Sequence, residues 1–273
     1  MRIEARGLTF DVAAGGPEDG TPVLLLHGFP QDHREFELIL PELHAAGLRT
    51  FAYDQRGYAP GARPADVAAY TVVEAASDAL AILDELGVGE FHLVGHDWGA
   101  VVSWVIAALH PQRVRTLTAV SVPHIGAMAE ALRTDESQRE RFGYQAMLAA
   151  PDGEDAVRAD DFAWLRQVLA PIGDRAELYI DAMRDPGRLT GGINWYRARA
   201  AGGRGELPKV SVPTTFVWSD QDAAIGEAAA RLCAEWVTGD YELVTVAGVR
   251  HWVPEEAPGA LADAALARIG KTG

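Results

Sequence analysis

Cysteine is nearly absent, because the chain of 273 residues contains only Cys233. One thiol cannot form an intramolecular disulfide or a multi-thiolate metal site, which excludes a disulfide-stabilised secreted scaffold. We therefore expect a protein of a reducing compartment, and the expected location is cytoplasmic.

Positive charge is also scarce. The chain has 24 lysines and arginines against 39 aspartates and glutamates, a formal net charge of −15, and its only lysines are Lys209 and Lys271. A surface this acidic repels phosphate backbones and anionic lipid headgroups. We therefore expect no nucleic acid and no membrane surface among its partners.

Long apolar runs are missing as well. Residues 1–10 contain no apolar segment of the length that a secretory signal needs. The most apolar stretch, residues 100–109, is far shorter than the roughly 20 residues of a membrane-spanning helix, so it predicts a buried helix. The composition, 48% hydrophobic and 23% charged, is that of a globular protein whose length approaches the limit for one core.

Short apolar runs alternate with helical patterns along the chain. The helix predicted over residues 71–86 has apolar residues at helical spacing and ends at Gly87. This alternation predicts an α/β fold with a mostly parallel sheet covered by helices. The predicted strands are residues 23–26, 49–53, 91–94, 117–122, 214–218 and 241–246.

The pattern changes from about His124 to Leu207, where the segment is helical and polar and contains no convincing strand. We interpret residues 124–207 as a helical lid inserted into a core formed by residues 1–123 and 208–273. Residues 200–205 are rich in glycine and predict the loop that returns to the core. Such an insertion lies at the carboxyl ends of the strands, where open α/β sheets bind ligands.

The strongest motif is Gly95-His96-Asp97-Trp98-Gly99, between a predicted strand and a predicted helix. A nucleophile flanked by glycines at a strand-to-helix junction is the nucleophile elbow of the α/β-hydrolase fold. The turn is tight and strained, and larger flanking side chains would clash. The usual nucleophile is serine, whereas this chain has aspartate.

Asp97 decides the class of reaction. Its reference pKa is about 3.9, so it is a carboxylate at neutral pH and needs no base before it attacks. A carboxylate is a weak nucleophile toward amides and esters, but it can displace a leaving group at an sp³ carbon. The product is an alkyl ester of Asp97, and its hydrolysis requires a general base and an oxyanion hole.

His251 follows the last predicted strand and is the candidate base. Asp222 follows the preceding strand and is the candidate acid that orients His251 and stabilises its charged form. The chain order of nucleophile, acid and histidine is the one expected of this fold. Asp220 is an alternative for the acid, because a short loop allows a slip of two residues.

Two backbone N–H groups are expected to form the oxyanion hole, those of Trp98 and Phe29. Phe29 lies in His27-Gly28-Phe29-Pro30, at the end of an early predicted strand. We interpret His27 and His96 as packed, hydrogen-bonded structural residues. The other histidines have no constellation around them, so no metal site is expected.

In these motifs the chain resembles an α/β-hydrolase-fold epoxide hydrolase. The segments that match this family in order are HGFP, YDQRGY at residues 53–58, GHDWG and the terminal Gly-x-x-His-Trp. The resemblance extends from about Thr21 to Pro258. HGFP and GHDWG are also similar to haloalkane dehalogenases, which use the same aspartate mechanism.

The lid distinguishes the two families, because epoxide hydrolases of this type use two lid tyrosines to protonate the epoxide oxygen. By resemblance these are Tyr144, which is followed by Gln145, and Tyr179, which precedes Gly-Gly-Ile-Asn-Trp-Tyr-Arg at the family's approximate spacing. Tyr196 is the alternative for the second position. An opening epoxide forms a strongly basic alkoxide that needs an acid, and phenols with a reference pKa near 10 are protonated donors at neutral pH.

The resemblance implies an epoxide hydrolase without a cofactor or metal, with a small-molecule epoxide and water as substrates. Trp98, Gln145, Trp195 and Trp252 are expected to line the substrate pocket. The first alternative function is a haloalkane dehalogenase with the same Asp97 nucleophile. A further alternative is a non-catalytic ligand-binding protein of the same fold.

Overall fold

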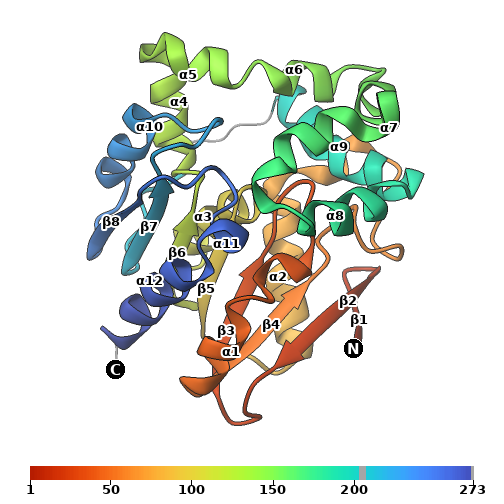
Figure 1. Ribbon diagram of the computed structural model, residues 1–273. Coiled ribbons are helices and arrows are strands. Elements are labelled where there is room, and N and C mark those ends of the chain that lie inside the picture. The colour runs from red at the N-terminus through yellow and green to blue at the C-terminus, as the bar shows by residue number, and fades with distance from the viewer. Residues whose placement is uncertain (203–206, 272–273) are drawn as a thin grey trace.

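A computed structural model describes residues 1–202 and 207–271. The described residues form one eight-stranded sheet in the order β1-β2-β4-β3-β5-β6-β7-β8 (Figure 1). Strands β3 to β8 pair in parallel, and β2 pairs antiparallel with β1 and with β4. The α/β fold with a mostly parallel sheet is therefore confirmed.

Each of the six predicted strands is present. Their bounds are β3 Thr21–Leu26, β4 Leu48–Tyr53, β5 Phe91–His96, β6 Val114–Val120, β7 Thr214–Ser219 and β8 Tyr241–Val246. The central strands are almost wholly buried on both faces, which is why they are continuous apolar runs in the sequence.

The sequence patterns did not indicate the first two strands, β1 (Arg2–Ala5) and β2 (Leu8–Gly15). They form a hairpin at the edge of the sheet, and exposed residues alternate with buried ones along β2. The turn between them has positive φ at both Arg6 and Gly7. An edge hairpin exposed on one face has no continuous apolar run, so the pattern used for the central strands does not detect it.

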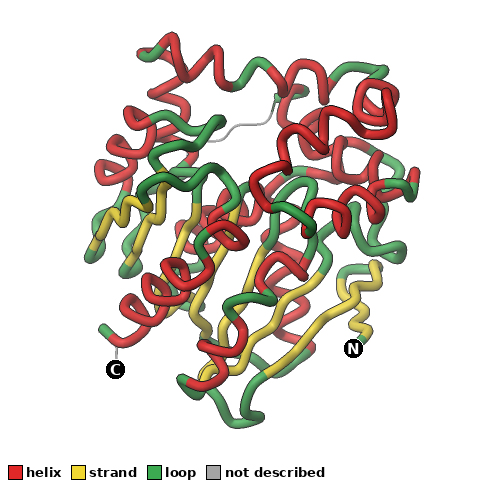
Figure 2. Tube along the Cα trace, in the orientation of Figure 1, coloured by secondary structure: helices red, strands yellow, loops and turns green. Residues whose placement is uncertain are grey.

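Helices cover both faces of the sheet. On one face lie α1 (Leu40–Ala45), α11 (Val253–Glu256) and α12 (Pro258–Gly270), and on the other lie α2 (Val72–Glu85) and α3 (Trp98–Leu109) (Figures 1 and 2). Alternate residues of β3 serve the two faces: Val23 and Leu25 pack in the cluster with α1 and α12, and Leu24 and Leu26 in the cluster with α2 and α3. The predicted helix over 71–86 corresponds to α2, and the Thr71 hydroxyl accepts from the Glu74 N–H at its start.

The segment between β6 and β7 is helical, as predicted for the lid, and the described residues contain no strand there. Its helices gather over one end of the sheet in Figure 1. They are α4 (Ile125–Thr134), α5 (Glu136–Arg141), α6 (Tyr144–Ala149), α7 (Gly153–Leu169), α8 (Arg175–Met183) and α9 (Pro186–Ala200). Residues 203–206 of the predicted return loop lie outside the described residues.

Helix α9 is tied to the core by polar contacts. The Arg188 guanidinium is buried and bonds to Asp54 at 3.0 Å and to Asp32 at 2.7 Å. The Trp195 indole donates to the Arg56 carbonyl at 2.9 Å. These contacts hold α9 against the loops that follow β3 and β4, and so position one wall of the region between lid and core.

Helix α10 (Glu227–Leu232) follows β7 in the core and packs against α4 of the lid segment. Among the described residues, no helix combines the length and apolar character needed to span a membrane.

Candidate active site

Asp97 lies at the junction of β5 and α3 with a backbone φ of 51° and ψ of −118°. A positive φ is strained for a residue with a Cβ, and such strain accumulates at functional sites. The flanking glycines leave room for the turn. A Cβ at Gly99 would lie 1.8 Å from the Leu26 carbonyl oxygen, and a Cβ at Gly95 would lie 2.4 Å from the Gly99 oxygen. The strained turn predicted for this motif is therefore present.

The carboxylate of Asp97 is buried, and one of its oxygens is held by the backbone. The Phe29 N–H donates to Asp97 Oδ1 at 2.8 Å. Trp98 is the first residue of α3, so its N–H belongs to the first turn, where backbone donors have no intrahelical acceptor. The positive end of this helix adjoins the carboxylate.

The backbone of Phe29 is placed by the loop that follows β4. The Gln55 N–H donates to His27 Nε2 at 2.9 Å, and the Gln55 side chain donates to the His27 carbonyl. Gly28 is required for the close approach, because a Cβ there would lie 2.3 Å from Asp97 Oδ1. His27 is fully buried and has the structural position expected for it.

His251 lies between two carboxylates. Its Nδ1 is 2.8 Å from Asp222 Oδ2, and its Nε2 is 3.5 Å from Asp97 Oδ2. Asp222 is oriented in turn by the N–H groups of Ala224 and Ile225, which donate to its Oδ1. The alternative acid, Asp220, is exposed and accepts from the Gly248 N–H, so the structure brings Asp222 and not Asp220 to the histidine.

These charges perturb one another. Burial lowers the pKa of His251, but the Asp222 and Asp97 carboxylates outweigh it and raise that pKa to about 10. Burial would raise the pKa of Asp97, but the hydrogen bond and charge of His251 hold it below its usual value. At neutral pH the site therefore contains an imidazolium between two carboxylates.

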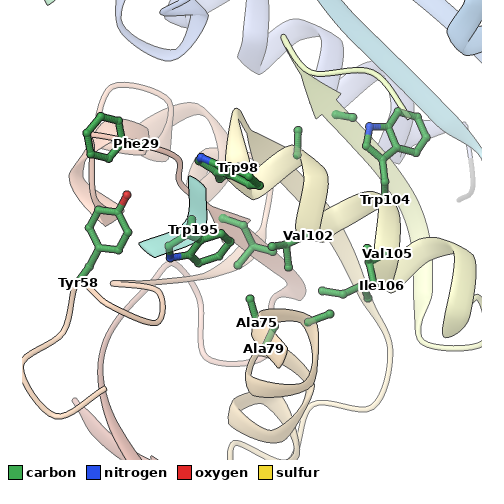
Figure 3. Packing of buried hydrophobic residues seen from close by; sticks show 14 of the residues in the cluster. Phe29, Tyr58, Ala75, Ala79, Trp98, Val102, Trp104, Val105, Ile106 and Trp195 are labelled. Atoms are coloured by element: carbon green, nitrogen blue, oxygen red, sulfur yellow. The ribbon is translucent and has the colours of Figure 1, made fainter. Parts of the chain in front are cut away.

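Two cavities meet at these side chains, with volumes of about 140 and 490 Å³. Both are lined by Asp97, His251, Tyr144 and Tyr196. Of the expected pocket residues, Trp98, Gln145 and Trp195 line the smaller cavity, and Trp252 lines the larger. Figure 3 shows Trp98 and Trp195 side by side, and their ring centroids are 5.5 Å apart.

Tyr144 begins α6, and Tyr196 lies on α9. Their ring centroids are 6.3 Å apart, and Tyr196 packs edge-on against both Trp98 and Phe29. Burial, followed by the charge of Asp97, raises the pKa of Tyr144, and burial, Tyr144 and Asp97 raise that of Tyr196. Both phenols therefore remain protonated at neutral pH, and both line the cavities that Asp97 lines.

The structure does not bring Tyr179 to Asp97, which corrects the expectation drawn for it from the resemblance. Tyr179 lies on α8 with no exposed surface, and its hydroxyl donates to Glu255 Oε1 at 2.9 Å. It lines neither of the two cavities. Tyr196, the alternative, occupies the position facing Tyr144, because α9 and not α8 packs against Phe29 and Trp98.

Tyr179→Phe is accordingly expected to reduce stability. The change removes the buried hydrogen bond to the Glu255 carboxylate and a longer bond from Arg175 Nη2 at 3.4 Å, while Glu255 keeps its bond from Gln31 Nε2 at 2.7 Å. We expect the free energy of unfolding to fall by about 1 kcal/mol, measured by urea denaturation at neutral pH. An unchanged midpoint and slope would show that these hydrogen bonds contribute nothing to the fold.

Glu35 is a buried residue that contacts His96, and the sequence motifs do not indicate it. His96 Nε2 contacts the His251 carbonyl at 2.9 Å, and His96 Nδ1 lies 3.3 Å from Glu35 Oε2. Burial and the charge of Asp97 raise the pKa of Glu35 well above its usual value. Glu35 lies in a short 3-10 helix far from GHDWG in the chain, and no local motif marks it.

Asp32, His33 and Asp54 form the one group among the described residues whose donor atoms lie close enough to hold a metal ion, all within 4.8 Å. Both carboxylates already bind Arg188, and Asp32 also binds Arg34 at 2.6 Å. These guanidinium groups supply the positive charge that a cation would bring. We therefore interpret the group as part of the contact between lid and core.

The chain is similar to known proteins over nearly its whole length. Residues 21–258 match the family described as alpha/beta hydrolase fold. The chain is 31% identical to epoxide hydrolase A of Mycobacterium tuberculosis, over 97% of this chain and 95% of that protein. It is 30% identical to the AB hydrolase superfamily protein YfhM of Bacillus subtilis, over 94% and 92%. A solved structure of an epoxide hydrolase from metagenomes of hot environments is 27% identical with a TM-score of 0.87, over 98% and 97%.

Proposed function

The chain belongs to the alpha/beta hydrolase fold family, and from this premise we propose that it hydrolyses an epoxide to a vicinal diol through a covalent ester on Asp97. Asp97 is the nucleophile, His251 the general base and Asp222 the residue that orients it. Tyr144 and Tyr196 donate to the epoxide oxygen. The resemblance to named epoxide hydrolases supports the reaction class.

One observation carries the proposal: a carboxylate occupies the nucleophile position, and two protonated phenols line the same cavities. A carboxylate attacks an sp³ carbon without prior deprotonation. An epoxide oxygen leaves as an alkoxide, so the reaction requires a proton donor where the ring opens. The direct test is chromatographic detection of the diol formed from styrene oxide, with the Asp97→Asn variant as the control.

In the first step, Asp97 Oδ2 attacks an epoxide carbon and the carbon–oxygen bond of the ring breaks. Oδ2 is the attacking oxygen, because Oδ1 is engaged by the Phe29 N–H. The oxygen released takes a proton from Tyr144 or Tyr196. The product is a β-hydroxyalkyl ester of Asp97.

In the second step, water attacks the ester carbonyl carbon while His251 accepts its proton. The negative charge that develops falls on Oδ1, where the Phe29 N–H is already in place and the Trp98 N–H lies at the start of α3. A donor positioned before the reaction stabilises this charge without reorganisation. The bond between the acyl carbon and Oδ2 then breaks, and Oδ2 takes the second proton of the attacking water. The diol leaves, Asp97 is again a carboxylate and His251 is again an imidazolium, as in the free protein.

Esterification also prepares His251 to act as a base. In the free protein its pKa is about 10, in part because of the charge of Asp97. The ester is neutral, so the contribution of Asp97 is lost and the pKa of His251 falls. Burial, which favours the neutral imidazole, then acts against the charge of Asp222 alone. The first step therefore lets His251 release its proton, which passes through solvent to the tyrosinate and leaves the neutral imidazole that the second step requires.

This coupling predicts that the ester accumulates in acid. The first step needs the Asp97 carboxylate, whose pKa is below its usual value, and the protonated phenols, whose pKa values are raised, so alkylation continues as the pH falls. The second step needs neutral His251 and slows about tenfold for each pH unit below the pKa that His251 has in the ester. Quenched steady-state samples should show a larger esterified fraction by intact-protein mass spectrometry at about pH 5 than at about pH 8. An esterified fraction that rises with pH would contradict this assignment of the base.

A further inference from the structure

We propose that the larger cavity selects epoxides that carry a carboxylate, which pairs with Arg141 and Arg250 where the cavity opens to solvent. The proposal rests on the proposed epoxide hydrolysis and names its substrate class. It assigns Arg141 and Arg250 as specificity-determining residues that take no part in the chemical steps.

The charges around the two cavities are opposite in sign to those of the whole chain. Apart from Asp97 and His251, every charged residue that lines either cavity is an arginine: Arg199 in the smaller one, and Arg141 and Arg250 in the larger. The chain has 39 acidic residues and a net charge of −15. In so acidic a protein, arginines as the only further charged residues in the cavity linings favour an anionic ligand at this position.

Arg141 and Arg250 approach the cavity from different parts of the fold. Arg141 ends α5 of the lid, and its Nη1 donates to the Asp222 carbonyl at 2.7 Å. Arg250 directly precedes His251 in the core. Both arginines are exposed although both line the cavity, so they lie at its mouth.

Neither guanidinium is neutralised by a carboxylate of the described chain. Among the described residues, the Arg141 side chain donates to a backbone carbonyl and to no carboxylate. The nearby Glu256 carboxylate accepts from the backbone N–H groups of Arg250 and Trp252. Most other described arginines pair with acids, as Arg188 does with Asp32, although Arg49 and Arg139 also donate to backbone carbonyls and not to carboxylates. The planar donors of Arg141 and Arg250 therefore retain the capacity to bind a carboxylate through two parallel hydrogen bonds.

The rest of the larger cavity is mostly apolar, which defines the remainder of the substrate. Trp164, Val168, Pro171 and Trp252 lie in its wall, and the buried Asp97 and His251 also line it. The expected substrate thus has an epoxide at one end, an apolar spacer in the middle and a carboxylate at the other end. The arginines anchor the carboxylate while the spacer displaces water from the apolar wall.

The experiment compares acids with neutral amides of the same shape. The test compounds are para-oxiranylbenzoate and its carboxamide, the terminal epoxide of undecylenic acid and its carboxamide, and styrene oxide as the neutral parent. For each acid and amide, kcat and KM are measured for the unaltered chain, Arg141→Gln, Arg250→Gln and Arg250→Lys. Arg2→Gln is the matched control, because Arg2 lies on β1 at the far edge of the sheet and its loss changes the net charge equally.

We expect kcat/KM to be about tenfold higher for at least one acid than for its amide, mainly through KM, because a hydrogen-bonded ion pair is lost in the amide. Arg141→Gln and Arg250→Gln should each remove most of this ratio, Arg250→Lys should restore part of it, and Arg2→Gln should leave it unchanged. High salt should reduce the ratio for the unaltered chain.

The proposed substrate class would be overturned if kcat/KM were equal for acids and amides, or if the acid-to-amide ratio persisted in both glutamine variants. In either case, hydrolysis of styrene oxide would still support the proposed function. Absence of diol from every compound, the neutral parent included, would overturn both. A ratio that Arg2→Gln lowers as much as Arg250→Gln would attribute the preference to net charge and overturn the assignment of the two arginines.

Discussion

His251→Gln should stop turnover after the first chemical step and leave the substrate on Asp97 as an ester. Glutamine removes the base, and general base catalysis contributes about a hundredfold to ten-thousandfold to such a step. The Asp97 carboxylate and the Phe29 N–H that holds its Oδ1 remain, so alkylation proceeds. Intact-protein mass spectrometry after incubation with styrene oxide should show one adduct with the full mass of the epoxide.

The matched control is His251→Gln combined with Asp97→Asn, in which an amide replaces the attacking carboxylate at nearly constant volume. No adduct should form in this double variant, and peptide mapping of the single variant should place the adduct on the peptide that contains Asp97. An adduct on another residue, or one that persists in the double variant, would contradict the assigned nucleophile. An adduct from a haloalkane alone, lighter by the hydrogen halide, would move the assignment to a dehalogenase.

Loss of both lid phenols should abolish epoxide ring opening. In Tyr144→Phe or Tyr196→Phe one donor remains, and we expect kcat/KM for styrene oxide to fall about tenfold to a hundredfold. In the double variant the alkoxide has no acid, and the loss should exceed about a thousandfold. The rate of ester formation, followed by quenched mass spectrometry, is the relevant measurement because the phenols act before the ester exists.

Tyr179→Phe is the matched control for these two variants, because it removes the same hydroxyl from another lid tyrosine that lines neither cavity. Its rate of ester formation should stay within about twofold of the rate of the unaltered chain. A twofold change corresponds to a few tenths of a kcal/mol in the activation free energy. A large loss in Tyr179→Phe with little change in Tyr196→Phe would reverse the choice between them. Release of halide from haloalkanes that survives in the double variant would favour the dehalogenase alternative.

The features that the sequence predicts correctly are those that adjacent residues determine. GHDWG is informative because its backbone shape must be produced by adjacent residues: a positive φ at Asp97 and two glycines whose Cβ atoms would collide with neighbouring backbone. The buried parallel strands are similarly visible, because burial on both faces requires consecutive apolar residues. The edge hairpin β1–β2 lacks that signal and was missed.

The choice between Asp220 and Asp222 needed the fold. Both aspartates follow β7, two residues apart, and the sequence favours Asp222 by position without excluding Asp220. In the structure the N–H groups of Ala224 and Ile225 turn Asp222 inward, while Asp220 points to the Gly248 N–H at the surface. The backbone path of this loop determines which aspartate reaches His251, and the sequence of the loop does not reveal that path.

The sequence by itself therefore determined the α/β fold, the helical insertion and the aspartate at the nucleophile position, because each depends on neighbouring residues or on a regular period. Only the tertiary structure decided that Tyr196 and not Tyr179 faces Tyr144, and that Arg141 and Arg250 line one cavity. These pairings join residues from separate helices and loops. Long-range contacts determine which side of a helix faces a cavity, as the hydrogen bond to Glu255 does for Tyr179. Such contacts have no signature in the local sequence.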